Sequence, residues 1–204
     1  MPLTPENLEI AKYRLEWWKL AVAALTPIGI AVLTYFVSSS LNERESVLRK
    51  SEQILSEKQK TYSKLGENLN IIYVYVADVG DFRQYTPSQV VDKKRNADRT
   101  FFMYRPYWSR ETLGRYTEFM DSAFEMYTGV GKNARIRTNA REKKAAYALD
   151  NKPWQSDWDD SFTGQSDPNI KDRYDALVSA FLNDIATSTI STAELTKQSS
   201  APAP

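Results

Sequence analysis

The feature that most constrains this chain is a long uncharged segment near its start. Residues 20–42 contain no Asp, Glu, Lys or Arg, and most of them are apolar. As a helix rising about 1.5 Å per residue, the segment would reach about 35 Å, enough to cross a hydrocarbon core of about 30 Å. Aromatic residues, which favour the headgroup zone, stand near its two ends: Trp17, Trp18, Tyr35 and Phe36. The sequence therefore predicts one transmembrane helix over residues 20–42, with these four rings at the membrane interface.

Two other interpretations of this segment fit less well. A cleaved signal peptide has a shorter apolar core, and residues 37–40 offer only a weak cleavage site. A buried core helix seldom keeps this length without a polar face. Within the span, Pro27 predicts a bend, and the leucines four residues to either side of Gly29 exclude a GxxxG dimer motif.

The charges that flank the span do not determine its orientation. Three basic residues lie on each side of it: Lys12, Arg14 and Lys19 before, and Arg44, Arg49 and Lys50 after. The positive-inside rule therefore gives a tie.

A heptad repeat follows the span. Apolar residues recur at every seventh position: Leu41, Leu48, Leu55, Tyr62, Leu69 and Val76. Residues 43–65 contain no proline or glycine, so we expect one continuous helix from the span that ends at Gly80. The lower half of the repeat has apolar companions and predicts a core-facing helix. The upper half, with seam residues Leu41, Leu48 and Leu55, has polar companions, and we expect it to pair with a helix of a second copy or of another protein.

Caps and apolar spacing predict further helices beyond Gly80. The run Thr86-Pro-Ser-Gln89 has the form of a capping box and begins a helix that ends before Pro106. Ser109 caps a second helix, which we expect to continue almost to Gly129. Less regular patterns predict helices over residues 138–149 and 154–162, and a last helix begins at residues 167–168. From residue 187 onward Ser, Thr, Ala and Pro dominate, which predicts a disordered tail.

These elements together predict an all-α fold. An N-terminal transmembrane helix continues into a long heptad-bearing helix, which packs into a C-terminal bundle of about five helices. The expected organisation is a flank (1–19), a transmembrane helix (20–42), an exit helix or coiled-coil stalk (43–65), a helical bundle (66–186) and a disordered tail (187–204).

Composition excludes several kinds of chemistry. The chain contains no histidine and no cysteine, which excludes zinc fingers, disulfide frameworks and Cys or Ser-His nucleophiles. Residues 129–133 lack the first glycine and the hydroxyl of a phosphate-binding P-loop. The aspartates around residues 157–160 do not match a calcium-loop spacing. We therefore predict no catalytic, cofactor-binding or metal-binding residues, no cofactor and no enzymatic activity.

The densest run of positive charge is a candidate binding patch. Its members are Lys132, Arg135, Arg137, Arg141, Lys143 and Lys144, and four basic residues from an earlier helix could join them: Lys93, Lys94, Arg95 and Arg99. Such a patch could bind anionic lipid, nucleic acid or an acidic protein surface. The alternative is a pair of ordinary solvated helix faces, because acidic residues balance the total charge to a net +1.

Several short motifs follow one another along the chain: Ala24-Leu-Thr-Pro27, Asp78-Val-Gly80, Tyr104-Arg-Pro106, Tyr127-Thr-Gly129 and Arg135-Ile-Arg-Thr138. Their order resembles that of a family of uncharacterised bacterial single-span membrane proteins. The resemblance, over about residues 15–185, implies an N-terminal anchor and a helical domain in the cytoplasm. Because these motifs are turn and packing signals, the resemblance implies no active site.

The sequence leaves several functions open. We expect a membrane-anchored helical interaction protein, a scaffold or sensor that holds a partner or self-associates at the inner face of the bacterial plasma membrane. The alternative is a membrane-acting effector of a bacterial defence or toxin system that oligomerises and perturbs the bilayer, since small anchored proteins of this architecture also occur beside bacterial defence genes. A hydrolase or nuclease that uses the aspartates has least support, because no nucleophile, base and orienting group stand at a defined spacing.

Overall fold

The structure is a computed structural model, and it describes the backbone of residues 5–126 and 129–200. The side chains of residues 5–16 and 197–200, and of several positions between 20 and 44, are outside the described part. The chain divides into two compact units: Met1–Lys50 with Glu194–Pro204, and Ser51–Ala193.

Helix α1 (Pro5–Val76) begins in the first unit and ends in the second. The uncharged segment is helical throughout, and Pro27 lies inside the helix. Large apolar side chains of this segment, such as Leu25, Ile30 and Leu33, are 59–67% exposed. Among the described residues, no helix reaches the length and apolarity needed to cross a membrane. The transmembrane helix is therefore not supported by the structure and stays a prediction from the sequence.

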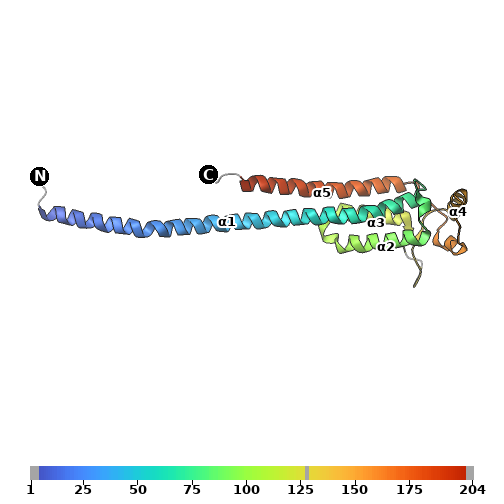
Figure 1. The fold of residues 1–204 in the computed structure, drawn as a ribbon, viewed down its shortest axis with the longest axis horizontal. Helices are drawn as coiled ribbons and strands as arrows, with labels where there is room; N and C mark the ends of the chain where they lie inside the picture. Colours follow the sequence, from blue (N-terminus) through green and yellow to red (C-terminus); the bar gives the residue numbers. More distant parts are fainter. Residues whose placement is uncertain (1–4, 127–128, 201–204) are drawn as a thin grey trace. The chain divides into compact units, whose positions relative to one another are not determined.

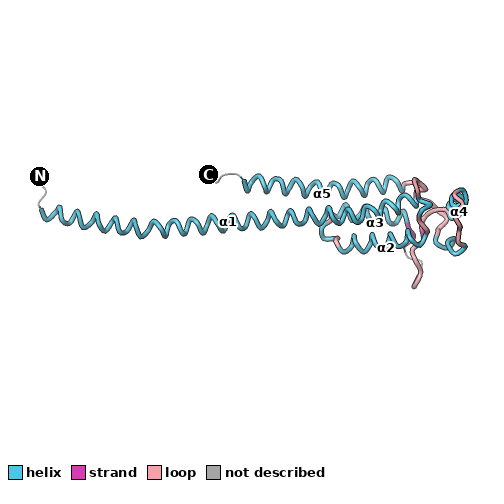
Figure 2. The backbone as a smooth tube through the Cα atoms, viewed as in Figure 1, coloured by secondary structure: helices cyan, strands magenta, loops and turns pink. Residues whose placement is uncertain are grey.

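The second unit is predominantly helical, as predicted (Figures 1 and 2). After α1 its main helices are α2 (Pro87–Met103), α3 (Arg110–Ala123), α4 (Ala140–Leu149) and α5 (Ile170–Ser200). Short 3-10 helices connect them: η1 (Phe82–Gln84), η2 (Arg105–Tyr107) and η3 (Ser156–Ser161). One small antiparallel pair, β1 (Phe124–Glu125) with β2 (Arg135–Ile136), joins α3 to α4.

Local caps fix where the middle helices begin. Thr86 accepts a hydrogen bond from the Gln89 backbone N–H, and the Gln89 side chain accepts one from the Thr86 N–H, which completes the predicted capping box. Ser109 caps α3 by accepting from the Thr112 N–H, also as predicted. Asn139 caps α4 in the same way. These side chains satisfy backbone donors that have no partner within the helix.

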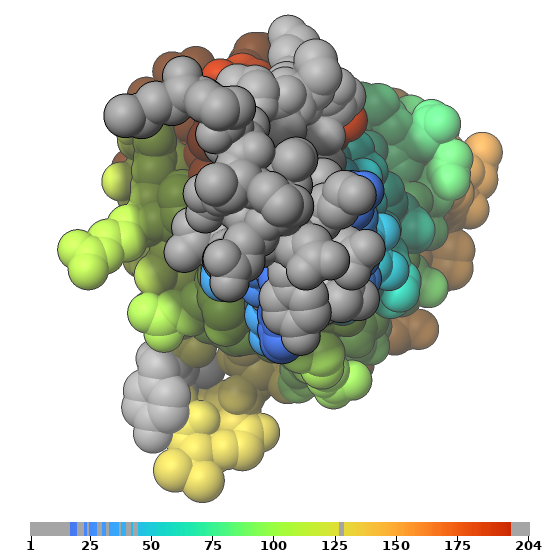
Figure 3. Space-filling view, turned by 90° about the vertical axis from the view of Figure 1, so that its left-hand side faces the viewer, coloured from blue at the N-terminus to red at the C-terminus, as the bar shows by residue number. Residues whose placement is uncertain are grey.

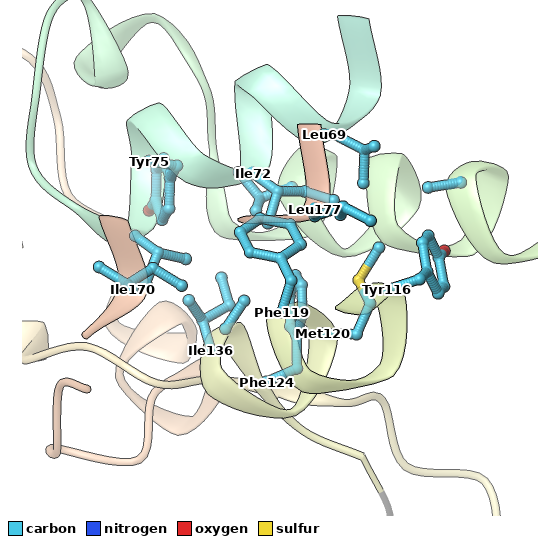
Figure 4. Packing of buried hydrophobic residues seen from close by; sticks show 14 of the residues in the cluster. Leu69, Ile72, Tyr75, Tyr116, Phe119, Met120, Phe124, Ile136, Ile170 and Leu177 are labelled. Carbon is cyan, nitrogen blue, oxygen red and sulfur yellow. The ribbon is translucent and has the colours of Figure 1, made fainter. Parts of the chain in front are cut away.

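The core of the second unit lies where α1, α3 and α5 meet (Figure 4). The lower heptad half of α1 faces it as predicted, with Leu65, Leu69 and Ile72 fully buried. Aromatic rings fill much of the remaining space. The rings of Phe101 and Tyr116 stack with centroids 3.8 Å apart, which ties α2 to α3.

The prediction that α1 ends at Gly80 is wrong, because the helix ends at Val76. Asp78 adopts a left-handed backbone conformation (φ 57°), and the Val79 N–H donates to the Val74 carbonyl, the long bond of a Schellman-type cap. An aspartate thus takes the position that glycine usually occupies. The expected glycine stop lies two residues further on, in the turn that leads to η1.

The side chain of Lys143, from α4, caps the C-terminal end of α1. Its ammonium group is fully buried and donates to the Tyr75 carbonyl oxygen and to Asp78 Oδ1. The rings of Tyr75 and Phe82 each lie 4.3 Å from Nζ, a cation–π distance. Burial lowers the pKa of Lys143, and the hydrogen bond and charge of Asp78 oppose that shift. A cation at the carbonyl end of a helix also complements the helix dipole.

Three of the other predicted helices differ from the structure. Helix α3 ends at Ala123 and not near Gly129, because Phe124 enters the strand pair opposite Ile136 and both side chains are buried there. Of the helix predicted over residues 154–162, only Ser156–Ser161 is helical, as the 3-10 helix η3. Helix α5 continues to Ser200, so the disorder predicted from residue 187 is not found over residues 187–200, and residues 201–204 lie outside the described part.

Replacing Lys143 by Met tests the cap of α1. The substitution keeps most of the side-chain volume but removes the donor from the Tyr75 carbonyl and the partner from Asp78. We expect the free energy of unfolding to fall by about 2–4 kcal/mol, because a buried carbonyl oxygen and a partly buried carboxylate lose their partner. Urea unfolding followed by circular dichroism measures this change. Lys144→Met, at the exposed neighbouring position, should change it by less than about 0.5 kcal/mol, and equal effects of the two would contradict the role of Lys143.

Candidate functional site

Within the second unit, α5 lies along α1 and contacts it through polar side chains. The hydroxyls of Ser51 and Thr192 are 2.6 Å apart. Lys58 Nζ donates to the Asp184 carbonyl oxygen at 3.1 Å and to Ser188 Oγ at 2.9 Å. Burial lowers the pKa of Lys58, and the charge of Asp184 opposes that shift.

These contacts place α5 beside the stretch of α1 that carries the predicted association seam. Ser51 and Lys58 are polar residues in the upper half of the heptad repeat, and both contact α5 of the same chain. Leu48 and Leu55 are half-buried, and the side chain of Leu41 lies outside the described residues. These contacts do not test the predicted pairing of the upper half with a helix of a second copy or of another protein. Association with a further helix stays a prediction.

The carboxylate of Asp184 joins α5 to the start of α3. Asp184 Oδ2 accepts hydrogen bonds from the Ser109 backbone N–H and from Thr112 Oγ1, both at 2.8 Å. A negative charge at a helix N-terminus is favourable because unpaired N–H groups and the helix dipole meet it there. Through its carbonyl oxygen the same residue accepts from Lys58, so Asp184 connects α1, α3 and α5.

Trp108 fills the space beside this junction. Its ring packs edge-on against Phe181 of α5, with centroids 4.8 Å apart. Lys58 Nζ lies 5.9 Å from the same ring. The turn between α2 and α3 is thus fixed to both long helices.

The predicted basic patch does not exist as one surface. Lys143 is buried at the end of α1, as described above. Arg135 pairs with Glu125 at 3.4 Å and donates to the Phe162 carbonyl, and Arg137 Nε donates to the Phe124 carbonyl at 3.2 Å. Only Lys132, Arg141 and Lys144 of the six are exposed.

The additional basic residues on α2 are also mostly paired. Three of them form ion pairs, with these N–O distances: Lys93 with Glu67 at 3.0 Å, Lys94 with Asp98 at 2.7 Å and Arg95 with Asp92 at 2.9 Å. The Lys93 pair could not be foreseen from the local sequence, because Glu67 belongs to α1, whereas the other two pairs join residues three or four positions apart within α2. The ten residues therefore do not form one patch, and binding of anionic lipid or nucleic acid stays a prediction from the sequence.

Two acidic residues of the stretch from Asp150 to Asp160 have structural partners. Asp150 pairs with Arg83 at 3.0 Å, and Asp159 accepts from the Trp154 indole N–H at 3.0 Å. In the described part of the chain, no three acidic side chains come together as a possible metal site.

Two polar hollows mark the surface of the second unit. One, of about 640 Å³, is lined by Ser88, Lys132, Arg135 and Asp160 among others. The second, of about 360 Å³, lies between Arg137, Arg173 and Asp167. Arg173 and Asp167 form an ion pair at 3.4 Å, and both hollows carry charges of each sign.

The four predicted membrane-interface rings lie on α1. Trp17, Trp18, Tyr35 and Phe36 are all exposed. Tyr35 and Phe36 make an edge-on ring contact, with centroids 6.0 Å apart. Among the described residues, none of these four side chains is buried against the rest of the protein.

The structure also reveals a surface that sequence analysis missed, at the turn from α2 to α3. Phe102 and Met103 are large apolar residues with exposed fractions of 52% and 66%. Arg99, Arg105 and Arg110 stand beside them in the sequence and are exposed. The signal was present as three arginines and several aromatic residues without a single acidic residue over positions 99–110.

Comparisons with protein-family models, curated proteins and solved structures gave no match. The resemblance to bacterial single-span membrane proteins therefore stays a prediction from sequence motifs.

Substitution of Asp184 tests the junction of the three helices. Asp184→Ala leaves the Ser109 N–H and the Thr112 hydroxyl without their acceptor, and we expect a loss of about 1–3 kcal/mol in the free energy of unfolding. Asp184→Asn keeps an acceptor oxygen without the charge and should lose less. Hydrogen exchange at the Ser109 amide, read together with urea unfolding, reports both effects. Asn183→Ala, at the exposed preceding position, is the control, and a loss as large as that of Asp184→Ala would contradict this assignment.

Proposed function

We propose that this protein is a membrane-anchored helical scaffold that holds a partner protein at the surface of the bacterial plasma membrane. The observation that carries the proposal is the uncharged segment of α1, residues 20–42, with its large apolar side chains exposed. The helical domain that follows on the same helix supplies the surface for a partner.

Exposure of so many apolar side chains in one uncharged helix needs an explanation. Burying a leucine-sized side chain is worth roughly 1.5–3 kcal/mol, so leaving Leu25, Ile30 and Leu33 in water is costly. A lipid bilayer removes this cost for every face of the helix at once. Exposed tryptophans at positions 17 and 18 suit the headgroup zone at one end of the segment, and Tyr35 with Phe36 suit it at the other.

A binding role is favoured over catalysis. The chain lacks histidine and cysteine, which removes two of the commonest catalytic side chains. The ionisable groups with shifted pKa values have structural roles. Burial lowers the pKa of Lys143, which caps α1, and of Lys58, which joins α1 to α5. Burial also raises the pKa of Tyr116, whose hydroxyl donates to Asp98.

The proposed orientation places the helical domain in the cytoplasm. Flanking charges give a tie, so the support is the motif resemblance and the basic bias of the stalk after Asn42, where Lys58, Lys60 and Lys64 extend the run of positive charge.

Charges placed in the segment test the anchor. We expect the natural chain to remain in the membrane pellet after alkaline carbonate extraction. Leu25→Lys with Leu33→Lys should release it, because each lysine near the bilayer centre costs about 2.5–3.5 kcal/mol. The matched control, Leu25→Phe with Leu33→Phe, should stay in the pellet. Recovery of the natural chain in the soluble fraction without detergent would contradict the anchor.

Protease added to intact spheroplasts tests the orientation. We expect residues 88–185 to survive as an uncut fragment, because the membrane shields the cytoplasmic side. The same protease should digest them once the spheroplasts are lysed. Digestion before lysis would reverse the orientation.

A further inference from the structure

The α2–α3 corner, defined as residues 99–110, combines exposed apolar and cationic side chains. Figure 3 shows side chains of the lime-coloured stretch around these residues reaching outward at the left of the view. Phe102 and Met103 are more than half exposed. Arg99, Arg105 and Arg110 are exposed in the same segment, and no acidic residue occurs in the corner.

The three arginines of the corner, unlike the other cations of α2, have no acidic partner among the described residues. Lys93, Lys94 and Arg95 each form an ion pair. Within the described residues, Arg99, Arg105 and Arg110 form neither an ion pair nor a side-chain hydrogen bond. The corner therefore presents three positive charges whose hydrogen-bond donors are open to an external acceptor.

The backbone of the corner is fixed in place. Helix η2 turns it through hydrogen bonds from the Tyr107 and Trp108 N–H groups to the carbonyls of residues 104 and 105. The Trp108 ring is buried against Phe181, and the Ser109 N–H is bound by Asp184. A rigid surface loses little conformational entropy when it binds, which favours affinity.

The composition of the corner is that of a protein-binding surface. Arginine, methionine and aromatic residues are enriched in protein interfaces, whereas lysine is depleted, and the corner contains no lysine. Arginine binds carboxylates through two parallel hydrogen bonds, which lysine cannot do. A lipid headgroup surface would be served by lysine as well as by arginine, so the exclusive use of arginine favours a protein carboxylate.

We propose that the α2–α3 corner binds an acidic segment of a partner protein. Carboxylates of that segment pair with Arg99, Arg105 and Arg110, and an apolar side chain between them covers Phe102 and Met103. The inference rests on the proposed function in one respect: this segment belongs to the partner that the scaffold holds.

Site-specific photo-crosslinking of the full chain in its native membranes tests the corner. The photoreactive residue p-benzoylphenylalanine replaces Met103, and in a matched control it replaces Leu149, an apolar residue of α4 that is 80% exposed. We expect a protein adduct at position 103 and not at 149. Mass spectrometry of the adduct should place the crosslink in a segment that contains several Asp or Glu residues.

Charge reversal then tests the pairing. Arg99→Glu with Arg105→Glu and Arg110→Glu should reduce the adduct about tenfold or more. Changing the acidic residues of the crosslinked segment to lysine should restore it in this triple variant. Glu67→Gln with Asp92→Gln, which removes acidic partners elsewhere on the surface, should leave the adduct unchanged.

Each other outcome contradicts the corner assignment. An adduct to lipid would mean a membrane-binding corner, and an adduct to a second copy would mean self-association. An adduct that survives charge reversal, an adduct in a segment without carboxylates, or no adduct at position 103 would each overturn the proposal. Fractionation of the same samples keeps the two proposals apart: loss of the chain from membranes refutes the anchor, whereas the adduct at position 103 reports on the corner in either fraction.

Discussion

The arrangement of the second unit depends on the polar contact between α1 and α5, in which Ser51 and Lys58 of α1 meet α5. Lys58 reaches the Asp184 carbonyl and Ser188, and the Asp184 carboxylate holds the first turn of α3. One residue of α5 thus fixes the relative positions of three helices. The aromatic core between them then packs in a defined arrangement, because Phe181 of α5 contacts both Tyr62 of α1 and Trp108.

This contact also explains why the disorder predicted from residue 187 does not match the helix in the structure. Residues after 187 have low helix propensity and little apolar surface, so by themselves they resemble a disordered tail. Ser51 and Lys58 are polar positions beside the heptad seam, and their spacing alone does not identify α5 as the helix that they contact. The two helices supply hydrogen-bonding groups to one another: Lys58 of α1 donates to α5, and the hydroxyls of Ser51 and Thr192 meet. The order of residues along the chain does not reveal that these groups pair.

Elements that depend on local interactions were predictable. The Thr86–Gln89 capping box and the Ser109 cap involve residues within three positions of one another, and the lower seam of α1 follows from spacing alone. Lys143 is the opposite case. Its partners, the Tyr75 carbonyl and Asp78, lie more than 60 residues away in the sequence. The sequence alone therefore did not distinguish Lys143, which caps a helix, from the basic residues near it.

Long-range contacts also determine which basic residues remain available to a binding partner. Positive charge in the sequence is densest over residues 132–144. A basic side chain is available to another molecule only if it is not already paired within the protein. Lys143 is buried and donates to the Tyr75 carbonyl, and Arg135 pairs with Glu125. The corner has fewer cations, and it contains no acidic residue that could pair with them. The Asp184 carboxylate contacts the corner at the Ser109 N–H and also accepts a hydrogen bond from the Thr112 hydroxyl. The residue that holds the corner rigid therefore also leaves its arginines available to another protein.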